Sequence, residues 1–398
     1  MLLSQARQLV SLNKLHAVGI ACVFAFAASA GAAEEPSIPP LPDTPAVVKV
    51  TPATTPAPIN ASVTLTPSEG TVKTQPIKTV GNKVLTLAGE PVLLRGLNIP
   101  SLEWNPEGQS LFRLLDTALL EWKANIIRLP VKGDFWFGRH DLPARRGADE
   151  SYRWIVDQVI AKAAANGAYV LLDYHHYRAP DADTLQFWND AATRYKNHPA
   201  VLFGLLNEPF SISWDVWLRG GPVEYHDKKK GETIRFESVG MQAVVDTVRA
   251  TGARNVVVVG GLDWAYDLTG VADGYEIDPR DGHGLIYDAH VYNWKRDWTG
   301  NVLCVADKHP ILVGEWGADT RTIPGTGTTA DTLESPYTWV PAFLGFMQKH
   351  GLHWTAWSFH PRAGPHVIDS YHMTPTPYFG AFVRAALGGE KFDETQTR

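Results

Sequence analysis

The amino-acid sequence predicts an α/β protein, a (β/α)8 TIM barrel with a short N-terminal β-hairpin. Two observations predict this class. From Ile77 onward, short β-rich apolar runs alternate with helical stretches, and the runs number eight. Eight β/α units in about 300 residues match the usual size of this barrel. An open doubly wound sheet is the rival, but no glycine-rich fingerprint follows the first apolar run.

The hairpin and the strands are recognised by their composition. Residues 80–94 predict the hairpin, because turn-forming residues stand at Gly81-Asn82 and at Ala88–Glu90. The runs that follow are nearly all apolar, as expected of parallel strands that are buried on both faces. They cover residues 93–98, 125–131, 168–174, 200–206, 255–260, 285–290, 311–315 and 353–359.

Helices are expected in the stretches between these runs. In residues 151–165, for example, Ile155, Val159 and Ile160 recur at helical spacing. Comparable stretches cover residues 109–122, 183–195, 236–250, 337–350 and 377–387. The insertion Ser211–Thr233, which follows the fourth run, is expected to form a long loop.

The first 76 residues differ from the rest in composition. Residues 1–33 combine a basic start, an uncharged apolar run and small residues before Glu34, which predicts a secretory signal peptide. An uncleaved membrane anchor is the alternative, but the run is short and rich in alanine. Residues 34–76 contain ten of the 28 prolines and no aromatic residue, so they predict a disordered Pro/Thr-rich linker. Residues 77–398 are then the catalytic domain, and the protein is expected to be secreted or periplasmic.

Composition excludes several other classes. The formal net charge is −6 and no basic stripe is present, so a nucleic-acid partner is not expected. Cys22 and Cys304 are the only cysteines, which excludes a disulfide framework and a cysteine-built metal site. Once the signal peptide is removed, Cys304 is expected to be a lone, buried thiol. The 14 tryptophans are a heavy usage for a chain of this length, which suggests a ligand-binding surface.

Polar and aromatic residues gather where the predicted strands end. Because the active site of such a barrel lies at the C-terminal ends of its strands, these residues are expected to meet at one rim. Two carboxylates on different strands that face one cleft are what the cleavage of a glycosidic bond requires. The rim residues are Arg128, Asp173, His175, His176, Asn207, Glu208, His290, Tyr292, Glu315 and Trp357.

The two glutamates are expected to differ in protonation. Glu315, within reach of Arg128 and the Tyr292 hydroxyl, would stay ionised and attack the anomeric carbon. Glu208, in a less charged place, would keep its proton and protonate the leaving oxygen. Asn207 can bond the sugar 2-hydroxyl group. Aromatic faces suited to the apolar side of a pyranose ring are expected at Trp357, Trp264, Trp136, Trp104 and Trp294.

Five motifs in fixed order resemble those of glycoside hydrolase family 5, the cellulase family A enzymes. They are Leu94–Asn98 (LRGLN), Asn125–Pro130 (NIIRLP), Leu206–Pro209 (LNEP), His290–Tyr292 (HVY) and Val313–Gly317 (VGEWG). The resemblance runs from Gly81 to about Leu387, and it implies a retaining double displacement on a (β/α)8 barrel without metal or cofactor. By position, Glu208 matches the family's acid/base and Glu315 its nucleophile. The matches to its subsite residues are Arg128, His175, Asn207, His290, Tyr292 and Trp357, with His176 a neighbouring possibility for His175.

The sequence therefore predicts a secreted retaining glycoside hydrolase, an endo-β-1,4-glucanase of the cellulase type. A β-mannanase, a xyloglucanase or an exo-β-glucosidase would use the same chemistry. The insertion Ser211–Thr233 departs from the family and would reshape the cleft, which leaves the substrate more open than the reaction. Two alternatives come from other classes, a non-catalytic carbohydrate-binding barrel and a hydrolase with a metal bound by Asp173–His176. The expected partner is a β-linked polysaccharide or oligosaccharide, with no lasting membrane association.

Overall fold

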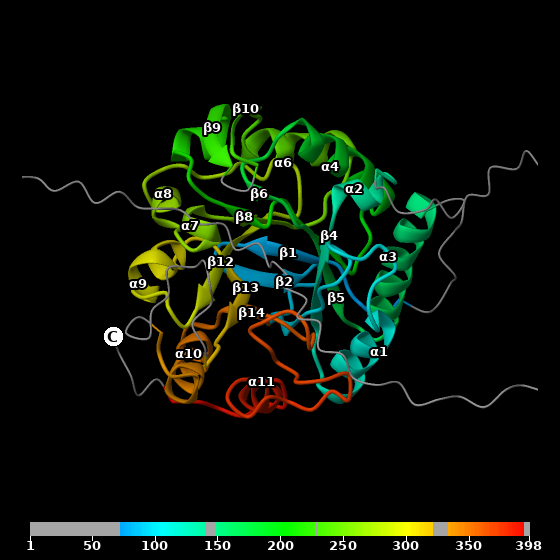
Figure 1. Ribbon diagram of the computed structural model, residues 1–398, viewed down its shortest axis with the longest axis vertical. Helices are drawn as coiled ribbons and strands as arrows, with labels where there is room; N and C mark the ends of the chain where they lie inside the picture. Colours follow the sequence, from blue (N-terminus) through cyan, green and yellow to red (C-terminus); the bar gives the residue numbers. More distant parts are fainter. Residues whose placement is uncertain (1–71, 140–147, 228–229, 321–332, 394–398) are drawn as a thin grey trace, which may run out of the picture. The chain divides into compact units, whose positions relative to one another are not determined.

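The computed structural model describes residues 72–139, 148–227, 230–320 and 333–393. In these ranges eight parallel strands close into a barrel, in which each strand pairs with the next and the last returns to the first (Figure 1). The strands are β3 (Arg95–Asn98), β4 (Ile126–Val131), β5 (Tyr169–Tyr174), β7 (Val201–Gly204), β11 (Val257–Gly260), β12 (Leu285–Tyr292), β13 (Ile311–Gly317) and β14 (His353–Ala356). Each of the eight predicted runs contains one of them, so the predicted barrel is confirmed.

Helices surround the barrel (Figure 1). The longer helical segments are α1 (Leu111–Asp116) with the π-helical turn η1 (Thr117–Glu121), α3 (Ala148–Ala165), α4 (Ala182–Arg194), α6 (Met241–Ala250), α10 (Pro336–His350) and α11 (Gly380–Leu387). Shorter helices are α2 (Gly133–Trp136), α5 (Trp214–Arg219), α7 (Leu262–Ala265), α8 (Thr269–Ala272), α9 (Trp298–Asn301) and the 3-10 turn η2 (Leu303–Val305). All six predicted helical stretches contain a helix, and only short helices follow β11 and β12.

Helix α4 illustrates why these stretches are helical. Asp181 caps its N-terminus, because the Asp181 carboxylate accepts a hydrogen bond from the Thr184 N–H and the Thr184 hydroxyl accepts one from the Asp181 N–H. Along one face Phe187, Trp188 and Ala191 are buried against the barrel. The cap defines where the helix begins, and burial of this apolar face supplies most of its stability.

The N-terminal hairpin closes one end of the barrel. Strand β1 (Ile77–Val80) pairs with β2 (Lys83–Thr86), and Ile77 and Val84 pack against the apolar side chains inside the barrel. The predicted hairpin is confirmed. The folded part begins earlier than residue 77, because the Lys73 N–H and the Thr74 hydroxyl both donate to the Ala164 carbonyl. The end of the predicted linker is therefore wrong by a few residues, and the signal peptide and the rest of the linker lie outside the described residues.

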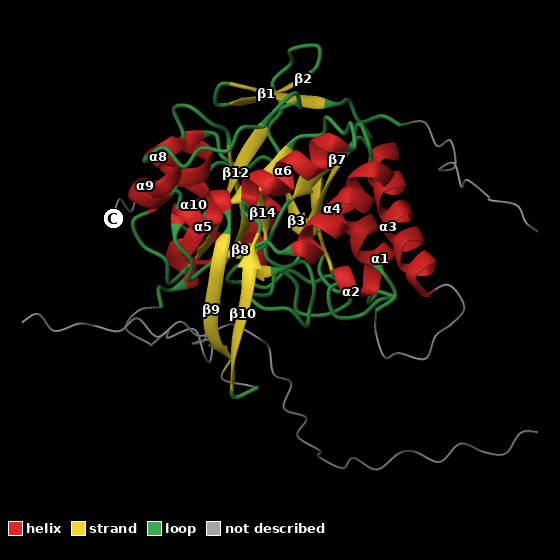
Figure 2. Cartoon of the chain, turned by 90° about the horizontal axis from the view of Figure 1, so that it is seen from above, coloured by secondary structure: helices red, strands yellow, loops and turns green. Residues whose placement is uncertain are grey.

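The insertion after β7 is an ordered structure rather than the long loop expected from its sequence. It consists of helix α5 and an antiparallel hairpin of β9 (Gly221–Asp227) and β10 (Glu232–Ser238). Helix α6 therefore begins at Met241, later than predicted. The hairpin projects from the end of the barrel opposite β1 and β2 (Figure 2). The short strands β6 (Tyr177–Arg178) and β8 (Glu208–Pro209) pair with each other at that end.

Two further observations concern the surface. Among the described helices, none has both the length and the apolar character needed to span a lipid bilayer. Cys304 is exposed at the turn η2, so the prediction of a buried thiol is wrong. Its neighbours Leu303 and Val305 are half-buried and buried, because the turn directs them toward the helix layer and Cys304 outward.

Candidate active site

The two predicted carboxylates come from different strands and meet at the C-terminal end of the barrel. Glu315 lies on β13 and Glu208 on the short strand β8. The pairing of β12 with β13 shifts between Asp288↔Leu312 and His290↔Glu315, so β13 carries one extra residue there. Such a bulge changes the direction of the following side chains. In this position it brings Glu315 opposite His290.

Glu315 is held by donors on both carboxylate oxygens. Arg128 Nη1 donates to Oε1 at 2.8 Å, and the Tyr292 hydroxyl donates to Oε2 at 2.5 Å. Burial alone would raise the pKa of Glu315, but the positive charges of His290 and Arg128, helped by His175, outweigh burial and lower this pKa below its ordinary value of 4.5. Glu315 is therefore the ionised carboxylate of the site.

The pKa of Glu208 is shifted in the opposite direction. Its Oε1 lies 3.0 Å from His290 Nδ1. Burial, together with the negative charge of Glu315, raises the pKa of Glu208 against the opposing effect of His290. Its side chain is 13% exposed, compared with 5% for Glu315. The pair thus consists of a deeply buried carboxylate, Glu315, and a more exposed carboxyl group, Glu208.

His290 connects the two carboxylates. Its Nδ1 faces Glu208 and lies 3.6 Å from Glu315 Oε2, while its Nε2 lies 3.5 Å from Asp288 Oδ2. Burial opposes protonation of the ring, but the charges of Glu315 and Asp288 raise the pKa of His290 to about 10. Asp288 also accepts the Gly314 N–H at 2.7 Å, and a Cβ at residue 314 would come within 2.4 Å of its carboxylate. Glycine is thus required at position 314 so that Asp288 can lie against the strand.

Arg128 is the central cation of the site and is 1% exposed. Besides Glu315, it donates to Asn98 Oδ1 at 3.0 Å and to Asn207 Oδ1 at 2.6 Å, and it lies 3.1 Å from Asp173. Burial disfavours its charge, but the negative charges of Asp173 and Glu315 raise its pKa. Arg128 therefore holds the ends of four strands in place. Asn98, which sequence reasoning did not select, is the last residue of the LRGLN motif.

His175, and not His176, belongs to this cluster. His175 Nδ1 lies 2.7 Å from Asp173 Oδ2 and its Nε2 lies 3.0 Å from the Tyr177 hydroxyl. Its ring stacks on Trp357 with a centroid separation of 5.8 Å and an angle of 5°. His176 lies on the other face of the chain, with its side chain 43% exposed and 3.9 Å from Asp181. The choice left open by the sequence is thus decided by which ring faces Trp357.

Two of the other predicted tryptophans, Trp264 and Trp136, differ in their exposure. Trp264 is partly exposed, stacks on Phe210 at 3.6 Å and meets the edge of Tyr177 at 6.3 Å. Trp136 is fully buried, and its indole N–H donates to Asp190 at 2.7 Å. The prediction of Trp136 as a sugar platform is wrong, because helix α2 turns this ring into the helix layer against Phe187 and Tyr152.

Glu103 is a further acidic residue that sequence reasoning did not select. Its Oε2 accepts the Ser101 N–H at 2.8 Å, whereas its Oε1 is buried without a hydrogen-bond partner among the described residues. Burial raises the pKa of Glu103 to about 7, against the charge of His175. The sequence signal available was its position beside Trp104, shortly after the first barrel strand.

Glu208, His290 and Glu315 are also residue types that can bind a metal ion. One atom each of Glu208, His290 and Glu315 lies within 4.8 Å of the others, a spacing that a cation could use. In this site, the same residues are joined by the hydrogen bond and charge contacts described above. Asp173, the acidic member of the other candidate metal site, is paired with Arg128 and is poorly suited to hold a second cation.

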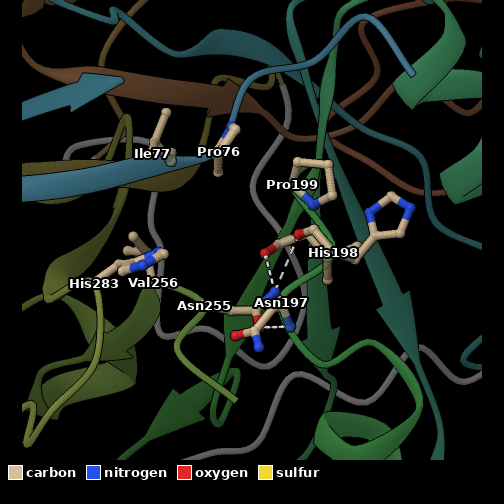
Figure 3. A pocket seen from close by; sticks show the side chains of 9 residues that line it. Pro76, Ile77, Asn197, His198, Pro199, Asn255, Val256 and His283 are labelled. Atoms are coloured by element: carbon tan, nitrogen blue, oxygen red, sulfur yellow. Dashed lines mark hydrogen bonds between the residues drawn. The ribbon is translucent and has the colours of Figure 1, made fainter. Parts of the chain in front are cut away.

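A pocket at the opposite end of the barrel is structural (Figure 3). Its lining residues are Pro76, Ile77, Asn197, His198, Pro199, Val201, Asn255, Val256 and His283. The Asn255 side chain accepts the Asn197 N–H at 2.9 Å and donates to the carbonyls of His198 and Val201. Asn255 therefore uses its amide group to hold the loop that precedes β7.

A closed parallel barrel whose rim brings together two carboxyl groups with opposite pKa shifts is an arrangement that O-glycosyl hydrolases use. The particular family follows from comparison with known proteins. The chain belongs to glycosyl hydrolase family 5, because the cellulase model of that family matches residues 85–363. The resemblance seen in the motifs is thereby confirmed.

Similar proteins carry cellulase names. Endoglucanase C of Evansella cellulosilytica is 26% identical over 316 residues, which cover 68% of this chain and 34% of the relative. Cellulase CelDZ1 of a Thermoanaerobacterium species is 24% identical over 301 residues, which cover 71% of this chain and 68% of the relative. This chain thus spans about a third of the length of the Evansella enzyme.

A similar solved structure shares the fold. It is the β-glucanase SdGluc5_26A of Saccharophagus degradans in complex with cellotetraose, with a TM-score of 0.62 and 24% identity. The match covers 79% of this chain and 94% of that structure. At this identity the likeness supports the barrel fold alone.

Proposed function

We propose that this protein is a retaining endo-β-1,4-glucanase. The observation that carries the proposal is the distance between its two carboxyl groups, since an oxygen of Glu208 lies within 4.8 Å of one of Glu315. Retaining glycosidases separate their carboxyl groups by about 5–5.5 Å, whereas inverting enzymes leave about 6.5–9.5 Å for a water molecule. The short separation supports direct attack by Glu315 on the sugar.

The first half of the reaction forms an ester. A Glu315 carboxylate oxygen attacks the anomeric carbon while the bond from that carbon to the leaving oxygen breaks, and Glu208 gives its proton to the leaving oxygen. Arg128 and Tyr292 hold the nucleophile in position through their two hydrogen bonds. Because Asn207 uses its carbonyl oxygen on Arg128, its amide NH2 group is the part that can donate to a sugar hydroxyl.

The second half releases the sugar. Glu208, now a carboxylate, takes a proton from a water molecule whose oxygen attacks the anomeric carbon, and the ester bond to Glu315 breaks. The pKa of each carboxyl group suits its first role, since burial and the Glu315 charge keep Glu208 protonated. The His290 cation lies between the two groups and stabilises whichever of them carries the negative charge.

The aromatic rings around the pair suit a pyranose chain. Trp357, stacked with His175, and Trp264, stacked on Phe210, lie close to the catalytic network. Apolar ring faces of this kind pack against the C–H groups of sugars. The names of the relatives favour β-1,4-glucan as the substrate, with mannan, xyloglucan and short β-glucosides as the alternatives.

Export is the second part of the proposal. Residues 1–33 would direct the chain out of the cytoplasm, and residues 34–71 would then tether the barrel. Mass spectrometry of the protein recovered outside the producing cells tests this. We expect a mature N-terminus near residue 33, and recovery of the intact chain from the membrane fraction would contradict it.

Substrate and mode of cleavage are tested together. Purified protein is incubated with soluble β-glucan, carboxymethyl-cellulose, mannan, xyloglucan and xylan, and reducing ends and viscosity are followed, with Glu315→Gln as the control. We expect the viscosity of β-glucan to fall before many reducing ends appear, and no change with Glu315→Gln. Preference for another polymer would change the substrate, and release of ends without loss of viscosity would show exo action. Loss of activity in EDTA would instead favour a metal-dependent reaction.

A further inference from the structure

The hairpin of β9 and β10 rises beside the acid/base. It projects from the C-terminal end of the barrel, on the same side of the rim as β6 and β8 (Figures 1 and 2). Its base is fixed there, because the Ser238 hydroxyl and the Val239 N–H both donate to the Pro180 carbonyl. Pro180 follows β6, whose Tyr177 pairs in register with Glu208. The hairpin is thus anchored to the small sheet that carries the proton donor.

The two faces of this hairpin differ in character. One face consists of the cross-strand pairs Val223–Phe236 and Tyr225–Ile234. Val223 is buried, while Tyr225, Ile234 and Phe236 are half-buried and lie outside the hydrophobic core formed by the described residues. The opposite face is polar and exposed, with the ion pair Glu224–Arg235 and the pair His226–Thr233. The hairpin therefore has an apolar face that core packing does not account for.

A continuous stack of planar groups joins this apolar face to the cleft. The Arg178 guanidinium lies 3.9 Å from the Tyr225 ring centroid and 4.3 Å from that of Phe210. Phe210 stacks in turn on Trp264 at 3.6 Å with an angle of 9°. Tyr177, 37% exposed, meets the edge of Trp264. The order from the acid/base outward is thus Tyr177, Trp264, Phe210, Arg178 and Tyr225.

We propose that the apolar face of the β9–β10 hairpin, centred on Tyr225 and Ile234, is a binding subsite for the leaving-group side of a β-linked glucan chain. This inference rests on the proposed function. If Glu208 protonates the leaving oxygen, the groups that lie beyond Glu208 face the departing part of the sugar chain. The occupant is a neutral sugar chain. The only charged group in the stack is the Arg178 guanidinium, which already lies against the rings of Phe210 and Tyr225 and so does not call for an anionic partner. Ring faces suit the C–H side of a pyranose, and half-buried polar edges suit its hydroxyls.

Two substrates separate this subsite from the catalytic centre. Soluble cellohexaose has glucose units on the leaving-group side, whereas 2,4-dinitrophenyl β-cellobioside has only the aryl group there. For Tyr225→Ala and Ile234→Ala, we expect kcat/KM on cellohexaose to fall about tenfold, the factor given by about 1.4 kcal/mol of lost contact. On the aryl glycoside we expect kcat/KM to stay unchanged. Ile234→Ala is included because it leaves the Arg178–Tyr225 contact in place.

Matched controls lie on the polar face of the same hairpin. Thr233→Ala and His226→Ala should leave both rates unchanged. Equal losses on both substrates, or losses with the polar-face variants, would overturn the subsite but not the proposed function. Failure of the unaltered protein to hydrolyse either substrate would overturn both. Sedimentation of the unaltered protein and of Tyr225→Ala tests a second copy of the chain as the occupant, and a dimer that dissociates in the variant would overturn the subsite.

Discussion

The two ends of the barrel interior consist of opposite kinds of side chain, although the same strands supply both. At the N-terminal end, the interior is filled by Ile126, Leu171, Leu202, Val258, Ile286 and Leu312 and is closed by Ile77 and Val84. At the C-terminal end, the strands contribute a cation and several carboxylates, joined by the contacts around Arg128. On β13 the change takes place between Leu312 and Glu315.

The comparison separates stability from chemistry. Burial of the apolar end removes hydrocarbon from water, which is the main favourable contribution to folding. Buried ion pairs add little to stability, because desolvation of the charges offsets their attraction. Replacements at the polar end that keep the shape of the side chain and leave no charge unpaired are therefore expected to affect activity far more than folding. The reverse is expected of replacements at the apolar end.

The largest expected effect is the loss of activity in Glu315→Gln. The amide keeps the shape of the side chain and Arg128 keeps its ion pair with Asp173, so the fold should persist. The nucleophile is lost, and kcat should fall by several powers of ten. Steady-state rates on soluble β-glucan, with a denaturant curve for each protein, check this. Activity near that of the unaltered protein would end the assignment of Glu315 as nucleophile.

The next effect depends on the leaving group. In Glu208→Ala no proton donor remains, so kcat/KM on β-glucan should fall by roughly 10²–10⁴-fold. On 2,4-dinitrophenyl β-cellobioside, the rate at which the ester with Glu315 forms should fall much less, because the dinitrophenolate leaves without needing a proton. Added azide should restore turnover and give a β-glycosyl azide, detected by NMR. An α-linked product would contradict retention of configuration.

Leu312 lies on β13, the strand that carries Glu315, but toward the apolar end of the barrel. The replacement Leu312→Ala should therefore lower stability and leave activity unchanged. Leu312 is fully buried, and truncation of a buried leucine costs about 2–5 kcal/mol. Urea unfolding followed by circular dichroism measures this loss, and kcat of the folded variant should match that of the unaltered protein. A fall in kcat with an unchanged unfolding midpoint would show that the two ends are not separable in this way.

The smallest expected effect is a displacement of the pH profile in His290→Gln. Activity requires Glu315 ionised and Glu208 protonated, so the acidic limb follows the Glu315 pKa and the alkaline limb follows that of Glu208. His290 lowers the pKa of both carboxyl groups. Without its charge both values rise, so both limbs of kcat/KM should move to higher pH. Movement of either limb to lower pH would contradict the electrostatic role of His290.

Much of this structure could be predicted from sequence patterns. Each barrel strand coincides with a predicted apolar run, although β12 and β13 continue two residues further, because a parallel strand buried on both faces needs a short and nearly continuous apolar segment. Glu208 and Glu315 could be selected because they stand at the end of such a run, where the barrel places its site, and Arg128 because it is a charged residue within one. The predictions failed where they depended on distant contacts, as for Trp136.

Trp136 and the insertion illustrate this limit. The Phe135–Phe137 segment has the composition of an exposed aromatic loop, yet Asp190 and Phe187 from helix α4 enclose its central ring. The strands of the insertion are stabilised by pairing with each other and by contacts with Pro180 and Arg178. Apart from the mutual pairing of β9 and β10, these partners lie far away in the sequence.

The sequence by itself therefore determined the barrel, its order of strands and the position of Glu208 and Glu315 at its rim. These properties depend on local composition and on the rule that places a site at strand ends. Only the tertiary structure decided the bulge that brings Glu315 opposite His290, the approach of Glu103 to His175, the burial of Trp136 and the hairpin beside Glu208. The physical reason is that the direction and the electrostatic surroundings of a side chain depend on neighbours that only folding brings together.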